Sequence, residues 1–545
     1  MERNHLYASR IQCHGVGPAQ LSTTAMTALS EAFDVEFVSS ESGSDAAAEA
    51  MVLWGGDAEE VLRRCPAKRV LVIPGEATQG GPSIETIEIC GEIPGKPWLR
   101  GHSLKLPKPT RIVPFLGVPP GAEVMARSSA GPVWVRETVG DRMIDRVAWS
   151  LPAPAAGRAV FEWFHAGTFA LWLPLLQFVR EVTGEYRWQT PIKAYFMFDD
   201  PNLHARSYGF LRYAELTKHA RQFGYHASFA TIPFDVWYVN PAVAALFREN
   251  REQLSLLIHG NDHVLRELAQ EYSDEARRAL VGQALRRIQR LEAKSGVEVC
   301  RVMAAPHGAC SEAMMGEMAR FGFEAASISH GSLRHYNSTQ EWSQRLGCRP
   351  TEIIAGLPVI PRFPMKPDVF QESLFAAYLD QPIIPMGHHQ DVASGLGVME
   401  AMASQINRLG SVHWRRMGEI SKTHFQWRLE GQTLVVRPFS HLLRLEVPEA
   451  ATHLRLESHA RNVLGANRYG VKRATGERRE FAATETVAVT PGETVWLDLV
   501  AGERLDPNDV PSPRWKLKPI LRRLACEARE RMRQANAGWR RGAEV

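Results

Sequence analysis

The chain lacks the features that would assign it to a membrane or secreted class. No uninterrupted apolar run in its 545 residues approaches the length that crosses a bilayer, and the longest candidate, FALWLPLLQFV at 169–179, ends against Arg180 and Glu181. The N-terminus carries acidic and polar residues and no long apolar segment of the kind that a secretory signal needs. We therefore expect a soluble protein located in the cytoplasm.

Cysteine is scarce and irregularly spaced. The seven cysteines form no C-x-x-C pair; they lie at positions 13, 65, 90, 300, 310, 348 and 526. An odd number at this spacing argues against a disulfide framework and against a thiolate zinc site. We expect buried, reduced thiols.

The glycine fingerprint of a dinucleotide site is also missing. GVGPAQ at 15–20 lacks the third glycine of G-x-G-x-x-G and contains a proline. Gly55 and Gly56, followed by Asp57, predict an ordinary turn from a strand into a helix.

Positive charge is concentrated in the last 35 residues. The whole chain has a net charge of +4, residues 511–545 carry +7, and the remainder carries about −3. This is not the charge balance of a nucleic-acid-binding protein, so no nucleic acid partner is expected. One helical face of the tail collects Leu517, Ile520, Leu521, Leu524 and Ala528. We expect a helix docked by its leucines, with contact to a membrane surface as the alternative.

Four segments are predicted from the sequence pattern. Residues 1–155 alternate apolar runs with helix-like segments, which predicts a flavodoxin-like α/β layer. Residues 426–505 alternate apolar and polar residues without helices, which predicts a small antiparallel β-sandwich that serves packing or carbohydrate binding. Residues 506–545 form the basic helical tail. The fold class is therefore α/β and multidomain.

The central segment, 156–425, repeats a strand followed by a helix. About seven such units predict a barrel or partial barrel of parallel strands. The clearest helix spans 273–295, with Ser273 as its N-cap and Gly296 as its stop. The predicted strands lie at 192–198, 226–231, 254–258, 299–304, 324–328, 357–361 and 382–386.

Acids and histidines follow four of these strands directly. In a parallel barrel, functional side chains lie just past the carboxyl ends of the strands. The sequence YFMFDDPNLH at 195–204 places two adjacent carboxylates after a buried strand. The residues after the four strands are Asp199 and Asp200; His259 and His263; Pro306, His307 and Gly308; and His388 and His389.

Two histidines and one carboxylate suit a divalent cation such as zinc. If His259 ends its strand and His263 lies in the first turn of a following helix, capped by Asn261 or Asp262, both imidazoles can point into the barrel mouth. The charge of a cation would also offset the repulsion between Asp199 and Asp200, so that one binds the ion and the other stays ionised as a base.

These motifs resemble those of the polysaccharide (chitin) deacetylase superfamily, the NodB-like fold, over about residues 190–420. FDD, HGNDH, APHGACS and PMGHHQD occur in the family's order. The resemblance implies Asp199 as general base and His388 or His389 as general acid. It implies a loop at Pro306, His307 and Gly308 whose backbone N–H helps hold the oxyanion. It also implies a divalent metal, zinc first with Co²⁺ or Ni²⁺ as alternatives, on Asp200, His259 and His263.

The full layout further resembles large microbial exopolysaccharide deacetylases, in which a glutamine amidotransferase-like domain precedes the deacetylase domain. The nucleophilic cysteine of such an amidotransferase is not apparent in residues 1–155, which implies a non-catalytic scaffold. Two positions depart from the deacetylase pattern: Ala304 replaces the arginine that tunes the base, and Pro201 replaces the glycine after the two acids. No Asp-Trp motif is found.

The resulting hypothesis is a metal-dependent deacetylase acting on an N-acetyl or O-acetyl group of an amino-sugar-containing glycan, sugar nucleotide or glycoside. The alternative is a non-catalytic glycan-binding or assembly protein on a degenerate barrel, which the Ala304 departure favours. A glycosidase pair is disfavoured because Asp199 and Asp200 are adjacent and can hardly flank one glycosidic bond. The sequence leaves the oligomeric state open.

Overall fold

The structure, a computed structural model, forms two compact units. Residues 1–189, 341–349 and 371–379 belong to the first unit, and residues 190–340, 350–370 and 380–545 belong to the second. The first unit extends past the predicted domain end at 155, and the division into four domains stays a prediction. The described residues are 9–14, 22–39, 49–55, 58–75, 81–152, 154, 157–339, 342, 345–366, 368–457, 468–482, 484–499, 504–513, 517, 520–529 and 532. The predictions for 15–20, for 56–57 and for most of the tail lie outside them.

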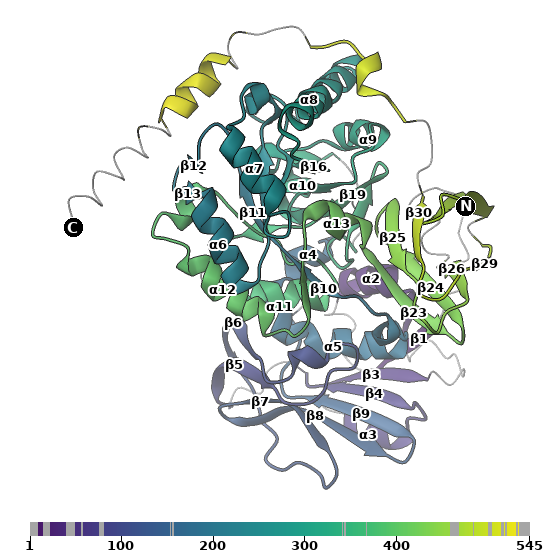
Figure 1. The fold of residues 1–545 in the computed structure, drawn as a ribbon. Helices are drawn as coiled ribbons and strands as arrows, with labels where there is room; N and C mark the ends of the chain where they lie inside the picture. The colour runs from purple at the N-terminus through teal and green to yellow at the C-terminus, as the bar shows by residue number, and fades with distance from the viewer. Residues whose placement is uncertain are drawn as a thin grey trace. The chain divides into compact units, whose positions relative to one another are not determined.

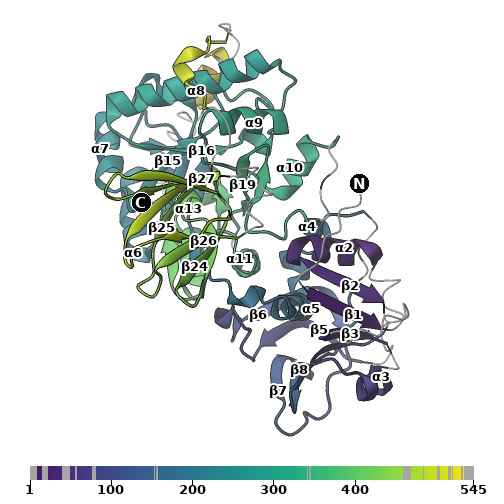
Figure 2. The same ribbon diagram turned by 90° about the vertical axis from the view of Figure 1, so that its right-hand side faces the viewer.

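A mixed nine-stranded sheet organises the first unit. The strand order is β2-β1-β3-β4-β9-β8-β7-β5-β6, and Figure 2 shows β2, β1 and β3 side by side. Strands β2, β1, β3, β4 and β9 pair in parallel, whereas β9, β8, β7, β5 and β6 pair antiparallel. The strands are β1 (Ser9–His14), β2 (Val35–Ser39), β3 (Ala50–Trp54), β4 (Arg69–Ile73), β5 (Ser83–Ile89), β6 (Ser103–Arg111), β7 (Glu123–Ser128), β8 (Gly131–Val139) and β9 (Arg142–Val147).

The longest apolar run of the sequence is a buried helix of this unit. FALWLPLLQFV begins helix α5 (Phe169–Val182), whose residues are buried from Phe169 to Arg180. The other helices of the unit are α2 (Ser22–Phe33), α3 (Ala58–Arg64) and α4 (Val160–Trp163), and α11 (Phe370–Tyr378) joins it from residue 371. Among the described residues no helix is both long and apolar enough to cross a membrane. The likeness to an amidotransferase domain stays a prediction.

An open, half-barrel sheet of nine strands organises the second unit (Figure 1). Its order is β18-β19-β17-β16-β15-β14-β11-β21-β20, and every neighbouring pair is parallel except β18 with β19. The strands are β11 (Phe196–Asp199), β14 (Ala227–Thr231), β15 (Leu254–Ile258), β16 (Val299–Ala304), β17 (Ala325–Ser327), β18 (Glu352–Ile354), β19 (Leu357–Ile360), β20 (Phe363–Pro364) and β21 (Pro385–Gly387). The carboxyl ends of the parallel strands therefore meet at one edge.

Each of the seven predicted strand segments overlaps a strand, because a strand buried on both faces leaves a continuous apolar run in the sequence. The overlap is smallest for 382–386, where β21 begins only at Pro385. The predicted strand at 192–198 is divided at Tyr195. Its first part, β10 (Ile192–Ala194), pairs with β22 (Val412–Trp414) instead of with the main sheet. The short edge strands β18 and β20 were not predicted, because they are brief and only partly buried.

Helices connect the strands of the half-barrel. The predicted helix at 273–295 is α8 (Asp274–Ser295), in which the Ser273 side chain accepts a hydrogen bond from the Ala276 backbone N–H and Gly296 adopts a left-handed conformation at the end. The others are α6 (Tyr213–Phe223), α7 (Pro241–Glu249), α9 (Glu312–Arg320), α10 (His330–Tyr336), α12 (Gly397–Asn407) and α13 (Met417–Lys422).

Two four-stranded sheets follow the half-barrel and share one hydrophobic cluster. One contains β23 (Phe425–Glu430), β24 (Thr433–Pro438), β26 (His453–Leu456) and β29 (Val487–Ala488). The other contains β25 (Leu442–Glu446), β30 (Thr494–Asp498), β27 (Arg468–Arg473) and β28 (Arg478–Ala482). The expectation of purely antiparallel pairing is wrong for β24 and β26, which run parallel, because the chain crosses to the other sheet through β25 before it returns.

The seven cysteines are free, and the expectation that they are buried is correct for five of them. Five are buried, and Cys90 and Cys526 are half-buried.

Replacing Leu257 by alanine should destabilise the half-barrel. Leu257 is 0% exposed in β15 and packs in a cluster with Tyr195, Met197 and Ala230. Leu-to-Ala changes at such sites cost about 2–5 kcal/mol, because transfer energy is lost and a cavity remains. Guanidinium chloride unfolding should show a lower midpoint for Leu257→Ala, whereas Leu429→Ala, at a side chain that is 39% exposed, should unfold close to the wild-type midpoint. Equal midpoints for the two variants would contradict the packing.

Candidate metal centre

Three of the predicted ligands converge at the carboxyl edge of the half-barrel. Oδ1 of Asp200 lies 3.4 Å from Nε2 of His259 and 3.1 Å from Nε2 of His263. One ligand atom of each residue lies within 4.8 Å of the others. His259 is buried and the other two are half-buried, so the group is shielded and still reachable from solvent.

The orientation of the His259 ring is set by the backbone of the neighbouring strand. Its Nδ1 lies 2.9 Å from the carbonyl oxygen of Ala304, the last residue of β16. Because a carbonyl only accepts hydrogen bonds, Nδ1 carries a proton, and Nε2 is the ring nitrogen that faces Asp200 and becomes available to a cation when it is deprotonated. This is the tautomer that a ligand to a cation requires.

The residues fit a divalent cation. Oδ1 of Asp200 is buried and makes no well-formed hydrogen bond within the described part of the chain, although two imidazole nitrogens face it. Burial alone would raise the pKa of Asp200, but the contacts with His259 and His263 hold that pKa well below its usual value. An ionised carboxylate with two imidazoles is the donor set of a zinc site that keeps open positions.

The two imidazoles have opposite pKa shifts. Burial would lower the pKa of His259, but the negative charges of Asp199 and Asp200 outweigh it and raise that pKa. Burial dominates at His263, whose pKa is lowered despite its contact with Asp200. The two carboxylates therefore act mainly on His259, whereas burial decides the pKa of His263.

The loop that carries His263 is organised by Glu267, which sequence reasoning missed. Its carboxylate accepts backbone N–H groups from Asn261 (2.7 Å), Asp262 (2.8 Å) and His263 (3.2 Å). Burial raises the pKa of Glu267 to about 7, and these hydrogen bonds oppose the shift. A glutamate a few residues after H-x-x-x-H was the available signal.

The expectation that His263 begins a helix is wrong. Its φ angle of 55° is left-handed, and residues 259–272 form a loop before α8 begins. Asn261 and Asp262 do not cap a helix there; their N–H groups bind Glu267, which closes the loop instead.

Asp199 is held by an arginine that sequence reasoning also missed. Nη1 of Arg362 donates to Oδ1 of Asp199 at 3.0 Å, and Nη2 donates to the carbonyl oxygen of Ala305 at 3.2 Å. Asp199 is 4% exposed and Arg362 is 6% exposed. Arg362 follows β19, so the strand-end rule that identified Asp199 would also have found it. The guanidinium therefore reaches Asp199 from the segment between β19 and β20.

The proline-glycine loop lies beside the three ligands. The ring of His307 is 5.0 Å from that of His263, centroid to centroid, and burial lowers the pKa of His307. The N–H groups of Gly308 and Ala309 donate to the carbonyls of Ala305 and Pro306. Within the described residues, no hydrogen bond is found for the backbone N–H of His307, whose φ angle is 57°.

The two late histidines follow β21, the neighbour of β11. His388 is exposed and its backbone N–H donates to Asp391, whereas His389 is buried. The ring of His389 packs against Tyr208 and Phe210, with centroids 5.5 Å and 5.6 Å apart. Both positions share the strand edge with Asp199.

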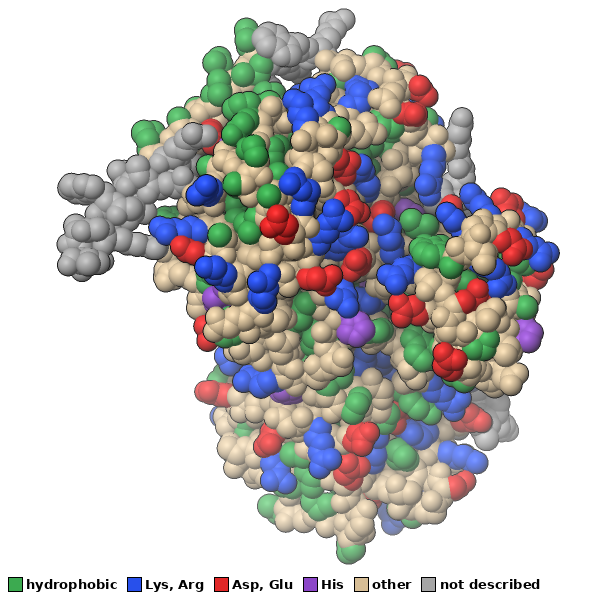
Figure 3. Space-filling model, in the orientation of Figure 1, with side chains coloured by type: hydrophobic (Ala, Val, Ile, Leu, Met, Phe, Trp, Pro, Cys, Tyr) green, Lys and Arg blue, Asp and Glu red, His purple; other side chains and the backbone are tan. Residues whose placement is uncertain are grey.

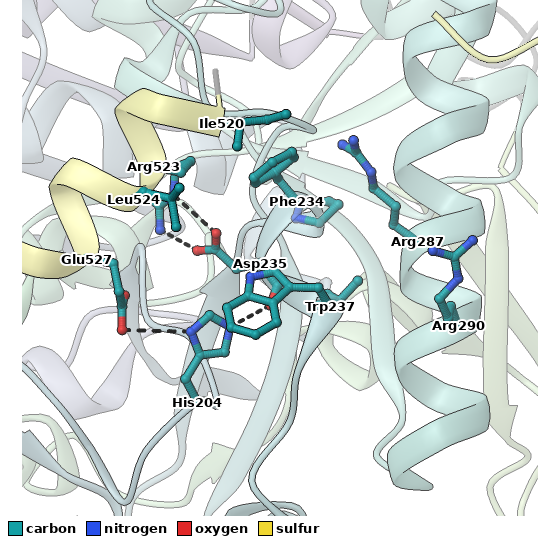
Figure 4. Close-up of a pocket in the computed structure, with 12 residues that line it drawn as sticks. His204, Phe234, Asp235, Trp237, Arg287, Arg290, Ile520, Arg523, Leu524 and Glu527 are labelled. Carbon is teal, nitrogen blue, oxygen red and sulfur yellow. Dashed lines mark hydrogen bonds and ion pairs between the residues drawn. The ribbon is translucent and has the colours of Figure 1, made fainter. Parts of the chain in front are cut away.

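The C-terminal helix docks at this edge, and the expectation that its leucines dock it is wrong. Arg523 is buried and forms an ion pair with Asp235, which follows β14 (Figure 4). The side chains of Leu521 and Leu524 are mostly exposed. An ion pair with its fixed geometry, rather than apolar contact, therefore decides which side of the helix faces the barrel.

Comparisons with known proteins give weak likenesses only. No family model and no curated protein matches the chain. The structure of Agd3, a novel carbohydrate deacetylase, is similar with a TM-score of 0.49 at 11% identity, covering 91% of this chain and 99% of that one. A putative polysaccharide deacetylase from Mycobacterium smegmatis gives a TM-score of 0.31 at 16% identity, covering 43% and 89%. BA3943, a CE4 family pseudoenzyme from Bacillus anthracis, gives a TM-score of 0.25 at 14% sequence identity, and the match covers 41% of this chain and 63% of that one. These values carry no argument about activity.

Removing the guanidinium of Arg362 should destabilise the protein. Arg362→Met leaves the buried carboxylate of Asp199 without its partner, which costs about 3–5 kcal/mol for a buried pair. Arg362→Lys should cost less because it keeps the charge. Thermal unfolding should also show that Asp199→Asn combined with Arg362→Met recovers part of the loss, whereas strictly additive effects would contradict the pairing.

Changing Glu267 should weaken metal binding without touching a ligand. In Glu267→Gln the side-chain NH₂ group faces backbone N–H donors and cannot accept from them. The loop of His263 therefore loses hydrogen bonds that hold it in place. Partners that orient ligands typically contribute about 10–100-fold in affinity. Competition with a chromophoric zinc chelator should show this loss for Glu267→Gln and none for Glu271→Gln, an exposed glutamate four residues on. Equal affinities in the two variants would rule out the anchoring role.

Proposed function

We propose that the chain is a metal-dependent hydrolase that removes an acetyl group from an amino-sugar-containing carbohydrate. The supporting observation is that Asp200, His259 and His263 converge beside a second carboxylate, Asp199, which has its own buried counter-charge in Arg362. Such a pair of carboxylates with separate partners can divide the work of ion binding and proton transfer.

Asp200, His259 and His263 would hold the divalent ion, with zinc first and Co²⁺ or Ni²⁺ as alternatives. When bound, the ion would supply positive charge that polarises a carbonyl and lowers the pKa of a water molecule. The hydrogen bond from His259 to Ala304 fixes the required tautomer before any ion arrives.

Asp199 serves as the general base. Arg362 holds it in one orientation, so that it takes a proton from the water that attacks the amide carbonyl. The new C–O bond places negative charge on the carbonyl oxygen, to which the backbone N–H of His307 is the available donor in the loop of Pro306, His307 and Gly308.

His388 or His389 serves as the general acid. As the C–N bond breaks, one of them donates a proton to the departing amine, and acetate and the free amino sugar are formed. His388 has the solvent access that a proton donor needs for recharging, and His389 has the fixed ring position.

A non-catalytic glycan-binding role is the alternative. The replacement of the family's arginine by Ala304 favoured it, but Arg362 supplies a guanidinium to Asp199. The substrate classes that we consider are a glycan, a sugar nucleotide, a lipid-linked glycan and a small glycoside.

Two aspartate variants should separate ion binding from catalysis. Asp200→Ala should lose both the bound ion and turnover, whereas Asp199→Asn should keep the ion and lose about 10²–10⁴-fold in rate, the usual share of a general base. Metal analysis together with acetate release from N-acetylhexosamine oligomers and UDP-N-acetylglucosamine measures both. Asp274→Asn, an exposed acid on α8, is the control and should match the wild type. Full activity after removal of the metal would refute the mechanism.

A further inference from the structure

The C-terminal helix has two different faces. In the described helical stretch 520–529, the stripe of Ile520, Arg523 and Glu527 is directed toward the barrel and is half-buried or buried. Leu521 is mostly exposed, and Leu524 lies at the border between the two faces, because it lines the cavity beside these residues and is also mostly exposed. A soluble helix normally buries its leucines and exposes its arginines, so this helix is docked in the reverse sense.

The docking fixes the helix beside the metal centre. Nε and Nη2 of Arg523 bind the two carboxylate oxygens of Asp235, with 3.1 Å between Nε and Oδ1. Oε2 of Glu527 accepts a hydrogen bond at 2.8 Å from Asn202, which is two residues after Asp200. Figure 4 shows Arg523 and Glu527 reaching from the helix to Asp235 and His204. Both anchors are therefore in loops of the strand edge that carries the metal ligands.

The outward face is strongly apolar. Leu521 is 64% exposed and Leu524 is 57% exposed. Leu517 and Met532 fall on the same face by helical spacing. Both are helical, and their exposed fractions are 60% and 61%. Beside the helix, Trp237 is 61% exposed; it lines a cavity of about 290 Å³ together with Leu524. We call Leu517, Leu521, Leu524, Met532 and Trp237 the apolar face.

Positive charge surrounds the apolar face. Arg522 and Arg529 are exposed on the helix, and Arg290 is exposed at the rim of the cavity. Residues 511–545 carry a charge of +7. Figure 3 shows hydrophobic side chains gathered in the upper part of the molecule with lysines and arginines among them. Leucines flanked by basic side chains, with a tryptophan at the edge, are typical of a surface that enters the headgroup region of an anionic bilayer.

We propose that the apolar face binds the surface of an anionic lipid bilayer and thereby holds the metal centre against that surface. The charge favours a lipid partner over a second copy of this chain, because two copies of the +7 segment would repel each other where the leucines meet.

The proposal also narrows the substrate, in a step that rests on the proposed function. A metal centre at a bilayer surface encounters glycans carried on lipid much more often than free sugars, since membrane attachment raises their effective concentration. A lipid-linked amino sugar is then the preferred class among those named above.

Vesicle binding tests the attachment independently of catalysis. The full chain is sedimented with vesicles of phosphatidylcholine containing phosphatidylglycerol, and with phosphatidylcholine alone. We expect binding to the anionic vesicles that weakens in high salt. The double variant Leu521→Ser, Leu524→Ser should bind at least about tenfold less, because apolar area is lost from the interface. Leu116→Ser, at a side chain that is fully exposed in the first unit, is the matched control and should bind like the wild type.

Three results would overturn the attachment. The first is that the wild type does not bind anionic vesicles. The second is that the double variant binds them as well as Leu116→Ser does. The third is that the wild type is a dimer and the double variant is a monomer. Circular dichroism and thermal unfolding establish that the double variant is folded, which the exposure of both leucines leads us to expect. A protein that binds vesicles but releases no acetate would refute the proposed function alone, and one that releases acetate without binding vesicles would refute the attachment alone.

Discussion

Two adjacent carboxylates at one strand end form the constraint on which the site depends. Like charges at this separation repel, and burial increases the repulsion by removing water. The repulsion is offset because each of the two carboxylates has its own basic partner. Asp199 lies against the guanidinium of Arg362, and Asp200 lies against two imidazoles that can share a cation with it. The same charges that would destabilise the strand end thus become a reason for it to bind an ion.

Much of the half-barrel could be predicted because its strands are buried on both faces. The segments 254–258 and 299–304 match β15 and β16 in full, since an uninterrupted apolar run has sharp ends in the sequence. The convergence of Asp200, His259 and His263 could be predicted by the same logic, because all three are polar residues just past such runs. These residues are far apart in the sequence, but parallel pairing brings the carboxyl ends of their strands to the same edge of the sheet.

What escaped prediction depends on long-range contacts or on backbone conformation. The strand-end rule would place Arg362 at the same edge as Asp199, but the pairing of these two side chains, 163 positions apart, is not indicated by the sequence around either of them. The sequence around His263 predicts the first turn of a helix. The backbone N–H groups there donate hydrogen bonds to the Glu267 carboxylate instead, and the segment is a loop. The docking of the C-terminal helix could not be predicted from its leucines, because the decisive contact is between Arg523 and Asp235, 288 residues apart. Hydrophobic patterns locate buried segments, whereas single ion pairs decide how they are oriented.

The left-handed backbone at the metal centre has an evolutionary consequence. Asp200, His263 and His307 have φ angles of 78°, 55° and 57°, a conformation that glycine adopts without strain and other residues adopt at about 1–3 kcal/mol each. Mutation to glycine at any of these positions would release strain while removing a functional side chain. Selection for fold stability and selection for chemistry therefore act in opposite directions on the same three codons. Under the proposed function, a lineage that no longer needs the reaction would lose the centre early and keep the barrel.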